Sequence, residues 1–226
     1  MRVAAVVPTL NEGAQLAECL RRLRSLDLDQ VVVVDGGSTD DTVAVARALG
    51  VCVLTAPRGR ALQLDTGASS VDADVLWFVH ADVQPPADAL AHIHHALADP
   101  DVVGGAFRTQ TRTDGGPSWL ARFLPLADLR ARRSLLPYGD QAMFCRRDAY
   151  RRVGGFPPWP ILEDVGLARR LWSVGRLVIA DACVSVSGRR YAHSPLYYAA
   201  VMNSFPLLWR AGVPLEWLAR AYGNPR

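Results

Sequence analysis

Short apolar runs alternate with helical segments along the N-terminal half of the chain, and each run ends in polar residues. This order of strand and helix builds a mostly parallel central sheet with helices on both faces, which is an α/β fold. Strands are expected over residues 3–8, 31–35, 51–55 and 75–79. Helices are expected over residues 11–26, 38–50, 60–69 and 86–97.

Two patterns indicate where the first two helices begin. Thr9-x-x-Glu12 and Ser38-x-x-Asp41 have the form of capping boxes, in which side chains satisfy the free amides of a first helical turn. The polar residues that follow parallel strands all lie at one edge of the sheet. We therefore expect a ligand site along that edge.

Beyond residue 100 the regular alternation stops and the pattern becomes a mixed α+β continuation. No repeat, low-complexity tract or linker interrupts it, so we expect a single domain over residues 1–226. Further strands are expected over residues 102–109, 142–145, 177–180 and 184–186, and further helical stretches over residues 115–136 and 165–174.

Charge and composition narrow the function. All 25 basic residues are arginine, and the formal net charge is +3. This charge is too small to favour nucleic acid as a partner, whereas arginine forks suit phosphate oxygens. The lack of lysine excludes a Walker-type phosphate loop and Schiff-base chemistry, since both require that residue.

The four cysteines, Cys19, Cys52, Cys145 and Cys183, form no C-x-x-C pair. Together with an N-terminus that runs directly into an apolar strand, this pattern predicts a reduced, cytoplasmic protein. No apolar run has the length that a bilayer span requires. Membrane contact is therefore expected to be peripheral at most, at the inner face of the membrane.

The turn after the second expected strand carries candidate chemistry. Asp35 ends the strand, and Gly36, Gly37 and Ser38 follow it. The carboxylate suits hydrogen bonds to a nucleobase or ribose, and the glycines allow a ligand to approach the backbone. An ordinary strand-to-helix turn with a capping residue explains the same pattern equally well.

A dinucleotide-binding fold is disfavoured because the first loop lacks G-x-G-x-x-G. Four other motifs occur along the chain: Pro8-Thr9-Leu10-Asn11-Glu12, the turn 35–40, His80-Ala81-Asp82 and Leu162-Glu163-Asp164. Taken in this order, they resemble the family 2 glycosyltransferases, which have the GT-A fold. Two further blocks, 58–63 and 139–157, are similar to a short bacterial subgroup sometimes linked to arsenosugar biosynthesis.

The resemblance implies an inverting transferase that uses a nucleotide-diphosphate sugar and Mg²⁺ or Mn²⁺. Residues 1–110 would then form a nucleotide-binding half, and residues 111–226 an acceptor-binding and catalytic half. Asp82 would bind the metal, and Asp164, next to Glu163, would be the general base. The donor-binding residues expected by position or charge are Pro8, Thr9, Asn11, Glu12, Asp35, Gly36, Ser38, Arg58, Arg60, Ala81, Asp82, Arg189 and Arg190.

Alternatives stay open at several of these positions. His80 stands where the metal motif has its first acid, and it either ligates a metal such as Mn²⁺ or is a hydrogen-bonded residue beneath the site. Glu163 and Asp164 also suit the positive end of a helix dipole, but the preceding Trp159 loop favours catalysis as a sugar platform. Arg189 and Arg190 either bind the diphosphate or belong to an exposed loop.

The acceptor is not identified by the sequence. Apolar and aromatic residues with interspersed arginines, at 119–133 and 197–217, fit either a lipid-linked acceptor at a membrane surface or packing and subunit contacts. A homo-oligomer is therefore left open. Two other functions also stay open: a nucleotidyltransferase, which normally has a glycine-rich first loop and a lysine, and a nucleotide-sugar-binding protein without turnover.

Overall fold

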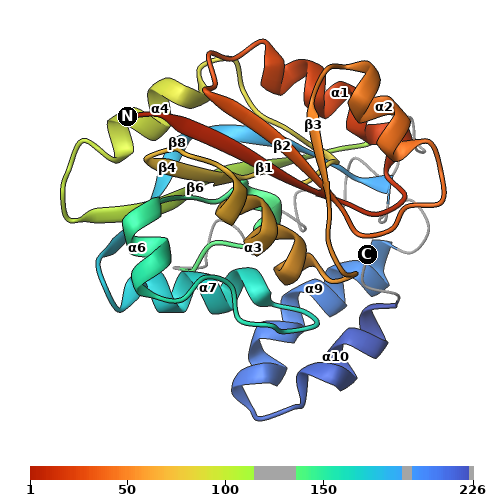
Figure 1. Cartoon of the computed structure of the whole chain (residues 1–226). Coiled ribbons are helices and arrows are strands. Elements are labelled where there is room, and N and C mark those ends of the chain that lie inside the picture. The colour runs from red at the N-terminus through yellow and green to blue at the C-terminus, as the bar shows by residue number, and fades with distance from the viewer. Residues whose placement is uncertain (115–135, 190–194, 224–226) are drawn as a thin grey trace.

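The computed structural model describes residues 1–114, 136–189 and 195–223. Its first four strands are β1 (Val3–Thr9), β2 (Gln30–Asp35), β3 (Cys52–Thr55) and β4 (Val75–Phe78). They lie side by side in the order β3-β2-β1-β4 and are all parallel. The expected parallel sheet with its common carboxyl edge is confirmed (Figure 1).

Each face of this sheet is buried by its own layer of helices. Val3, Ala5 and Val7 of β1 pack into one apolar cluster, while Ala4 and Val6 pack into the other, as expected from the alternation of side chains along a strand. The first cluster includes residues of α1 (Gly13–Arg24), α2 (Thr42–Ala48) and α4 (Ala89–Ala96). The second includes residues of α3 (Arg60–Ser70), α6 (Arg147–Arg152) and α7 (Glu163–Trp172).

The first two helices begin later than the sequence predicts, and neither capping box forms. Thr9 lies in β1, and its hydroxyl is 3.3 Å from Asp35 Oδ1 on the neighbouring strand. Ser38 donates to the same oxygen at 2.5 Å. The Thr9 hydroxyl thus links the ends of β1 and β2, and the Ser38 hydroxyl stabilises the turn after β2. Neither caps a helix, and α1 and α2 have no side-chain cap.

Four later strands extend the sheet: β5 (Val83–Gln84), β6 (Val102–Arg112), β7 (Phe144–Arg146) and β8 (Arg176–Ser187). β7 is antiparallel to both β4 and β6, so the sheet is mixed, in the order β3-β2-β1-β4-β7-β6-β8-β5. The two strands predicted over 177–186 are one continuous strand, β8. The predicted helical stretch 115–136 lies almost wholly outside the described residues.

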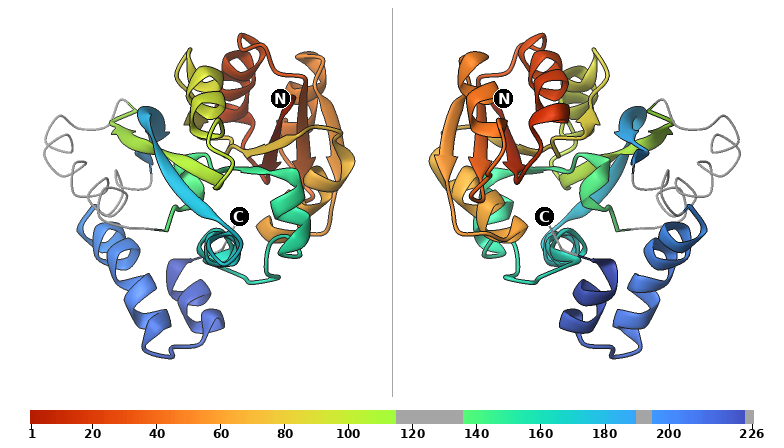
Figure 2. Two further views of the ribbon diagram at one scale, coloured as in Figure 1. Left: turned by 90° about the vertical axis from the view of Figure 1, so that its left-hand side faces the viewer. Right: turned by 90° about the vertical axis from the view of Figure 1, so that its right-hand side faces the viewer.

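Two helices close the described chain, α9 (Pro195–Arg210) and α10 (Leu215–Tyr222). They lie beside α7 and are joined to it by a third apolar cluster that includes Ile161, Val165 and Leu218 (Figure 2). Leu207 and Trp217 face solvent, with 64% and 66% of their surface exposed. Among the residues that the structure describes, no helix is both long and apolar enough to cross a bilayer.

Candidate active site

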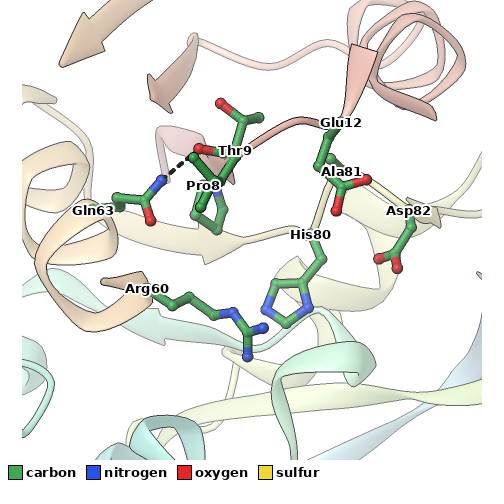
Figure 3. A pocket seen from close by; sticks show the side chains of 9 residues that line it. Pro8, Thr9, Glu12, Arg60, Gln63, His80, Ala81 and Asp82 are labelled. Atoms are coloured by element: carbon green, nitrogen blue, oxygen red, sulfur yellow. Dashed lines mark hydrogen bonds between the residues drawn. The ribbon is translucent and has the colours of Figure 1, made fainter. Parts of the chain in front are cut away.

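A polar pocket opens where β1 and β4 end, at the sheet edge that the sequence indicated (Figure 3). It brings together residues of the first loop, of α3 and of the segment after β4. The Arg60 guanidinium and the His80 imidazole point into the same space. The pocket is lined by Pro8, Thr9, Leu10, Glu12, Arg60, Gln63, His80, Ala81 and Asp82.

The segment after β4 owes its position to the buried strand that precedes it. The backbone amide of Val79 continues the pairing with β1, donating to Val6 at 3.0 Å. The chain then turns, and His80 accepts from the amide of Val83 at 3.0 Å. Val79 and Ala81 are buried in the core, so His80 and Asp82 are left at the pocket side.

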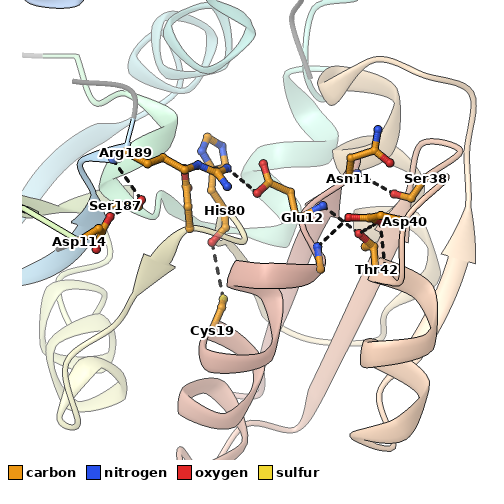
Figure 4. A network of polar contacts seen from close by, with 12 residues as sticks. Asn11, Glu12, Cys19, Ser38, Asp40, Thr42, His80, Asp114, Ser187 and Arg189 are labelled. Carbon is orange, nitrogen blue, oxygen red and sulfur yellow. Dashed lines mark hydrogen bonds and ion pairs between the residues drawn. The ribbon is translucent and has the colours of Figure 1, made fainter. Parts of the chain in front are cut away.

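Arg189, two residues after the end of β8, lies beside this pocket and comes from the far half of the chain (Figure 4). Its Nη2 lies 2.5 Å from Glu12 Oε2 and 3.9 Å from Asp82 Oδ2. Its Nε is buried and has no hydrogen-bond partner among the described residues. Arg190 lies outside the described residues.

Asp164 approaches His80 around Gly139, the first residue of a short 3₁₀ helix, Gly139–Gln141. The Gly139 amide donates to Asp164 Oδ2, and the Val165 amide donates to Oδ1 at 2.7 Å. A Cβ at position 139 would lie 2.7 Å from His80 Cε1 and 3.2 Å from Asp164 Oδ2. Gly139 thus leaves room for the His80 ring beside the Asp164 carboxylate, and a larger residue here would require the imidazole to shift.

The environment of Asp164 suits a base that works near neutral pH. Burial, and then the neighbouring charge of Glu163, raise its pKa to about 6, against the lowering effects of the Gly139 and Val165 amides and of Arg60. The carboxylate is then mostly ionised at pH 7 and still a stronger base than an ordinary aspartate.

Glu163 and Arg60 form a largely buried ion pair beside Asp164. Arg60 Nη1 lies 3.0 Å from Glu163 Oε1, and the two side chains are 25% and 3% exposed. The charges of Asp164 and Asp82 also act on the Arg60 guanidinium. Arg60 is thus a cation near three carboxylates: those of Glu163, of Asp164, the predicted base, and of Asp82, the predicted metal ligand.

Asp35, predicted to contact a nucleobase, is 4% exposed and holds its own turn together. Its Oδ2 accepts from the amides of Gly37 and Ser38, both at 2.9 Å. Asn11 joins this turn to the first loop. Its backbone amide donates to Ser38 Oγ at 2.9 Å, and its side-chain Oδ1 accepts from the backbone amide of Thr39 at 2.8 Å. The turn-stabilising interpretation therefore holds, and base contact stays a prediction.

Gln63 is a site residue that the sequence analysis missed. It is buried in α3, and its Nε2 donates to the backbone oxygens of Thr9 and Val34 at 2.7 and 2.9 Å. It thereby joins the carboxyl ends of β1 and β2. Its amide also packs against Gly36, where a Cβ would lie 3.1 Å from Gln63 Cδ. A polar residue on the apolar face of a helix was the available signal.

A second cavity, of about 220 Å³, lies on the other side of the Arg60–Glu163 pair. Arg58, predicted to contact the donor, lines this cavity and not the polar pocket. Trp159, the predicted sugar platform, lies here too. The lining residues are Arg58, Gly59, Arg60, Trp159, Pro160, Ile161, Glu163 and Tyr222.

The side chains of the polar pocket that could ligate a metal fit a divalent cation whose remaining ligands come from a substrate. No cluster of three or more metal-ligating side chains occurs among the described residues. Mg²⁺ is commonly held by one or two carboxylates together with substrate phosphates and water, and Mn²⁺ also accepts imidazole. Asp82, with His80 beside it in the pocket wall, meets that requirement.

Comparison with known sequences gives matches among glycosyltransferases. The pre-mycofactocin glycosyltransferase of Mycobacterium tuberculosis is 31% identical over 76% of this chain and 39% of its own length. The O-antigen chain rhamnosyltransferase RfbN of Salmonella typhimurium is 24% identical over 86% of this chain and 67% of its own. The chain thus spans about two fifths of the length of the mycobacterial relative.

Solved structures share the fold. TarS 1–349 of S. aureus, in complex with UDP-GlcNAc, matches with a TM-score of 0.66 and 17% identity over 90% of this chain and 66% of that TarS fragment. Glucosyl-3-phosphoglycerate synthase of Mycobacterium tuberculosis, in complex with Mn²⁺ and UDP, gives 0.62 and 20% identity over 94% and 81%. The sequence model of glycosyl transferase family 2 matches residues 4–154. The chain therefore belongs to glycosyl transferase family 2, as its four motifs indicated.

Proposed function

We propose that this protein is an inverting glycosyltransferase that moves a sugar from a nucleotide-diphosphate sugar to an acceptor hydroxyl. The observation that carries the proposal is that Arg189 and Asp164, from distant parts of the chain, lie beside two residues of the polar pocket: Arg189 is 3.9 Å from Asp82, and Asp164 lies with His80 beside Gly139. Each of these groups answers one requirement of the reaction.

Asp164 is the proposed general base. As the acceptor oxygen attacks the anomeric carbon, its proton passes to the Asp164 carboxylate, and the bond from that carbon to the diphosphate oxygen breaks on the opposite face. Attack from the opposite face inverts the anomeric centre. The pKa of about 6 supports this role because the base is ionised at neutral pH.

The leaving diphosphate gains negative charge, which Arg60 and Arg189 are placed to stabilise. The buried Nε of Arg189, without a partner among the described residues, supports an anionic guest at this position. Asp82 and His80 would hold a Mg²⁺ or Mn²⁺ ion, which supplies further positive charge to the diphosphate when bound. The complexes of TarS with UDP-GlcNAc and of the phosphoglycerate synthase with Mn²⁺ and UDP make uridine donors the first to test.

A donor screen tests this proposal. Nucleoside diphosphates and their sugars, with and without Mn²⁺, are added to the full chain, and the melting temperature is measured, since a ligand of the native state raises it. We expect one nucleotide family to stabilise the protein and its sugar to be transferred. Pyrophosphate release would instead indicate a nucleotidyltransferase. Donor binding with no turnover in the presence of acceptors would indicate a binding protein, and stabilisation by none would overturn the proposal.

The dependence of the rate on pH tests the base itself. The Asp164 carboxyl must be ionised to accept a proton, so the transfer rate is expected to fall as the pH decreases through about 6. Removing the nearby positive charge in Arg60→Gln should move this acidic limb to higher pH, because Arg60 lowers the pKa of Asp164. An unchanged limb would contradict the assignment.

We also infer that the acceptor is lipid-linked or anionic and that the chain works at the cytoplasmic face of a membrane. A relative from Pseudomonas aeruginosa, undecaprenyl-phosphate 4-deoxy-4-formamido-L-arabinose transferase, supports the first part by its name. Exposed Leu207, Leu208 and Trp217 near Arg210 support the second. Sedimentation with anionic vesicles tests it, and wild-type binding equal to that of Leu207→Ser/Trp217→Ser would contradict it.

A further inference from the structure

The cavity beyond the Arg60–Glu163 pair has a composition unlike that of the polar pocket. Trp159, Pro160, Ile161 and Tyr222 give it apolar and aromatic walls, and Arg58 places a cation at its rim. Arg60 borders both spaces, so the two are neighbours that share a wall. Asp164 follows Glu163 in the first turn of α7, directly beside that wall.

We propose that this cavity binds the acceptor, and that it selects an acceptor in which a carboxylate or phosphate lies next to a compact ring-sized apolar group. This rests on the proposed glycosyltransferase function and extends it to the class of acceptor. It also assigns Arg58 to the acceptor side, in place of the donor contact expected from the sequence.

The aromatic wall is held in place by α7. A Cβ at Gly166 would lie 2.4 Å from Pro157 Cγ and 2.8 Å from Trp159 Cζ3, so the Trp159 indole packs directly on the helix backbone. The indole also contacts Trp209 of α9, with ring centroids 5.4 Å apart. A ring held in place by two helices is a preformed platform, which loses little conformational entropy when a ligand binds.

Arg58 supplies the selectivity for an anion. Within the part of the chain that the structure describes, the Arg58 guanidinium makes no hydrogen bond or ion pair, whereas Arg60, two residues later, forms an ion pair with Glu163. An arginine without a carboxylate partner is available for bidentate contact with a carboxylate or phosphate. Beside an aromatic wall, it favours a ligand that joins an anion to an apolar group.

The size of the cavity limits the group that it accepts. At about 220 Å³ it is smaller than the roughly 300–1,000 Å³ of sites for drug-sized ligands, so it holds about one ring. The rest of a longer acceptor would extend into solvent past Arg58, which is exposed. An acceptor hydroxyl on the ring would face the wall that carries Glu163, next to Asp164.

Calorimetric titration of the full chain tests the proposal, with the donor pocket first saturated by UDP and Mn²⁺ so that probes reach the second cavity. Phenyl phosphate carries both features, and inorganic phosphate lacks the ring. We expect phenyl phosphate to bind at least about tenfold more tightly than inorganic phosphate. Geranyl phosphate distinguishes two classes of acceptor. If it binds more tightly than phenyl phosphate, the acceptor is a lipid phosphate; if it binds more weakly, the acceptor is a soluble anion that carries a ring.

Two variants identify the groups responsible. Arg58→Gln should weaken phenyl phosphate about tenfold, the effect of one lost charge-assisted contact, and leave UDP affinity unchanged. Arg47→Gln, an exposed arginine on α2, is the matched control and should change neither. Trp159→Phe should weaken phenyl phosphate but not inorganic phosphate, and its melting temperature shows whether it folds.

The outcomes separate this proposal from the underlying function. If Arg58→Gln weakens UDP as much as phenyl phosphate, Arg58 belongs to the donor side and the assignment is wrong. If phenyl phosphate binds no better than inorganic phosphate, the cavity does not recognise a ring. In both cases UDP binding by the unmodified chain would persist. Loss of the glycosyltransferase function itself would show instead as no nucleotide binding at all.

Discussion

The spaces on the two sides of the Arg60–Glu163 pair are built in different ways. The polar pocket is formed mainly by strand ends and the first turns that follow them, so a continuous sheet fixes its side chains. The second cavity is formed by the loop before α3, the loop at 159–161, the start of α7 and α10, which meet through side-chain packing and the Arg60–Glu163 ion pair. We infer that the sheet sets the donor side, while the acceptor side depends on contacts that are distant in sequence.

The largest expected effect is on the transfer rate when Asp164, the proposed general base, is substituted. Asp164→Asn removes the proton-accepting carboxylate but keeps an oxygen for the Gly139 or Val165 amide. We expect the transfer rate to fall by about 10²–10⁴-fold, measured as release of nucleoside diphosphate with acceptor present.

Asp148→Asn is the matched control for this change. Asp148 lies on α6 with 71% of its side chain exposed, so the same substitution there should leave the rate unchanged. UDP and phenyl phosphate should still bind to Asp164→Asn. A rate close to that of the unmodified chain would show that another group takes the proton.

The strand-end motifs could be predicted because their signals are local. An apolar run that ends in a polar residue marks a strand and its edge, so Thr9, Glu12 and Asp82 were expected at one pocket. By contrast, His80 and Asp164 come from distant segments, and both side chains lie beside Gly139. No local pattern encodes such an approach, so the sequence predicted both residues without predicting that they lie on either side of Gly139.

Breaking the pair that separates the two spaces should cost stability. Arg60→Met leaves Glu163, which is 2% exposed, as a buried charge without its arginine. We expect the free energy of unfolding, from urea titration, to fall by about 3 kcal/mol, the lower end for a buried pair because Arg60 is one-quarter exposed. The double variant Arg60→Met/Glu163→Leu should regain most of this. No recovery would mean that Arg60 acts through other partners.

A change confined to the donor side should leave the acceptor side intact. Gln63→Leu keeps a similar volume but leaves the backbone oxygens of Thr9 and Val34 without their shared donor. We expect a loss of about 2 kcal/mol in unfolding free energy and weaker UDP binding, with phenyl phosphate affinity unchanged. Gln110→Leu, at an exposed position of β6, should alter stability by less than about 0.5 kcal/mol.

The starts of α1 and α2 show that a local pattern can also predict an interaction that does not form. Thr9 and Ser38 have the spacing of capping residues, yet their hydroxyls contact Asp35. For Thr9 the acceptor is a carboxylate on the neighbouring strand β2, and for Ser38 it is the same carboxylate, three residues earlier in its own turn. The helices therefore begin at Gly13 and Thr42 without side-chain caps.

The smallest expected effect on stability comes from a substitution on the acceptor side, Gly166→Ala. In Gly166→Ala the new methyl group would displace Pro157 and the Trp159 ring, at a cost of about 2 kcal/mol, while alanine gains about 1 kcal/mol over glycine inside a helix. The net loss of unfolding free energy is therefore about 1 kcal/mol. Since the displaced ring forms the wall of the second cavity, phenyl phosphate should bind more weakly while UDP affinity stays the same. Equal weakening of both ligands would show that the two spaces respond as one unit, and the contrast with Gln63→Leu would be lost.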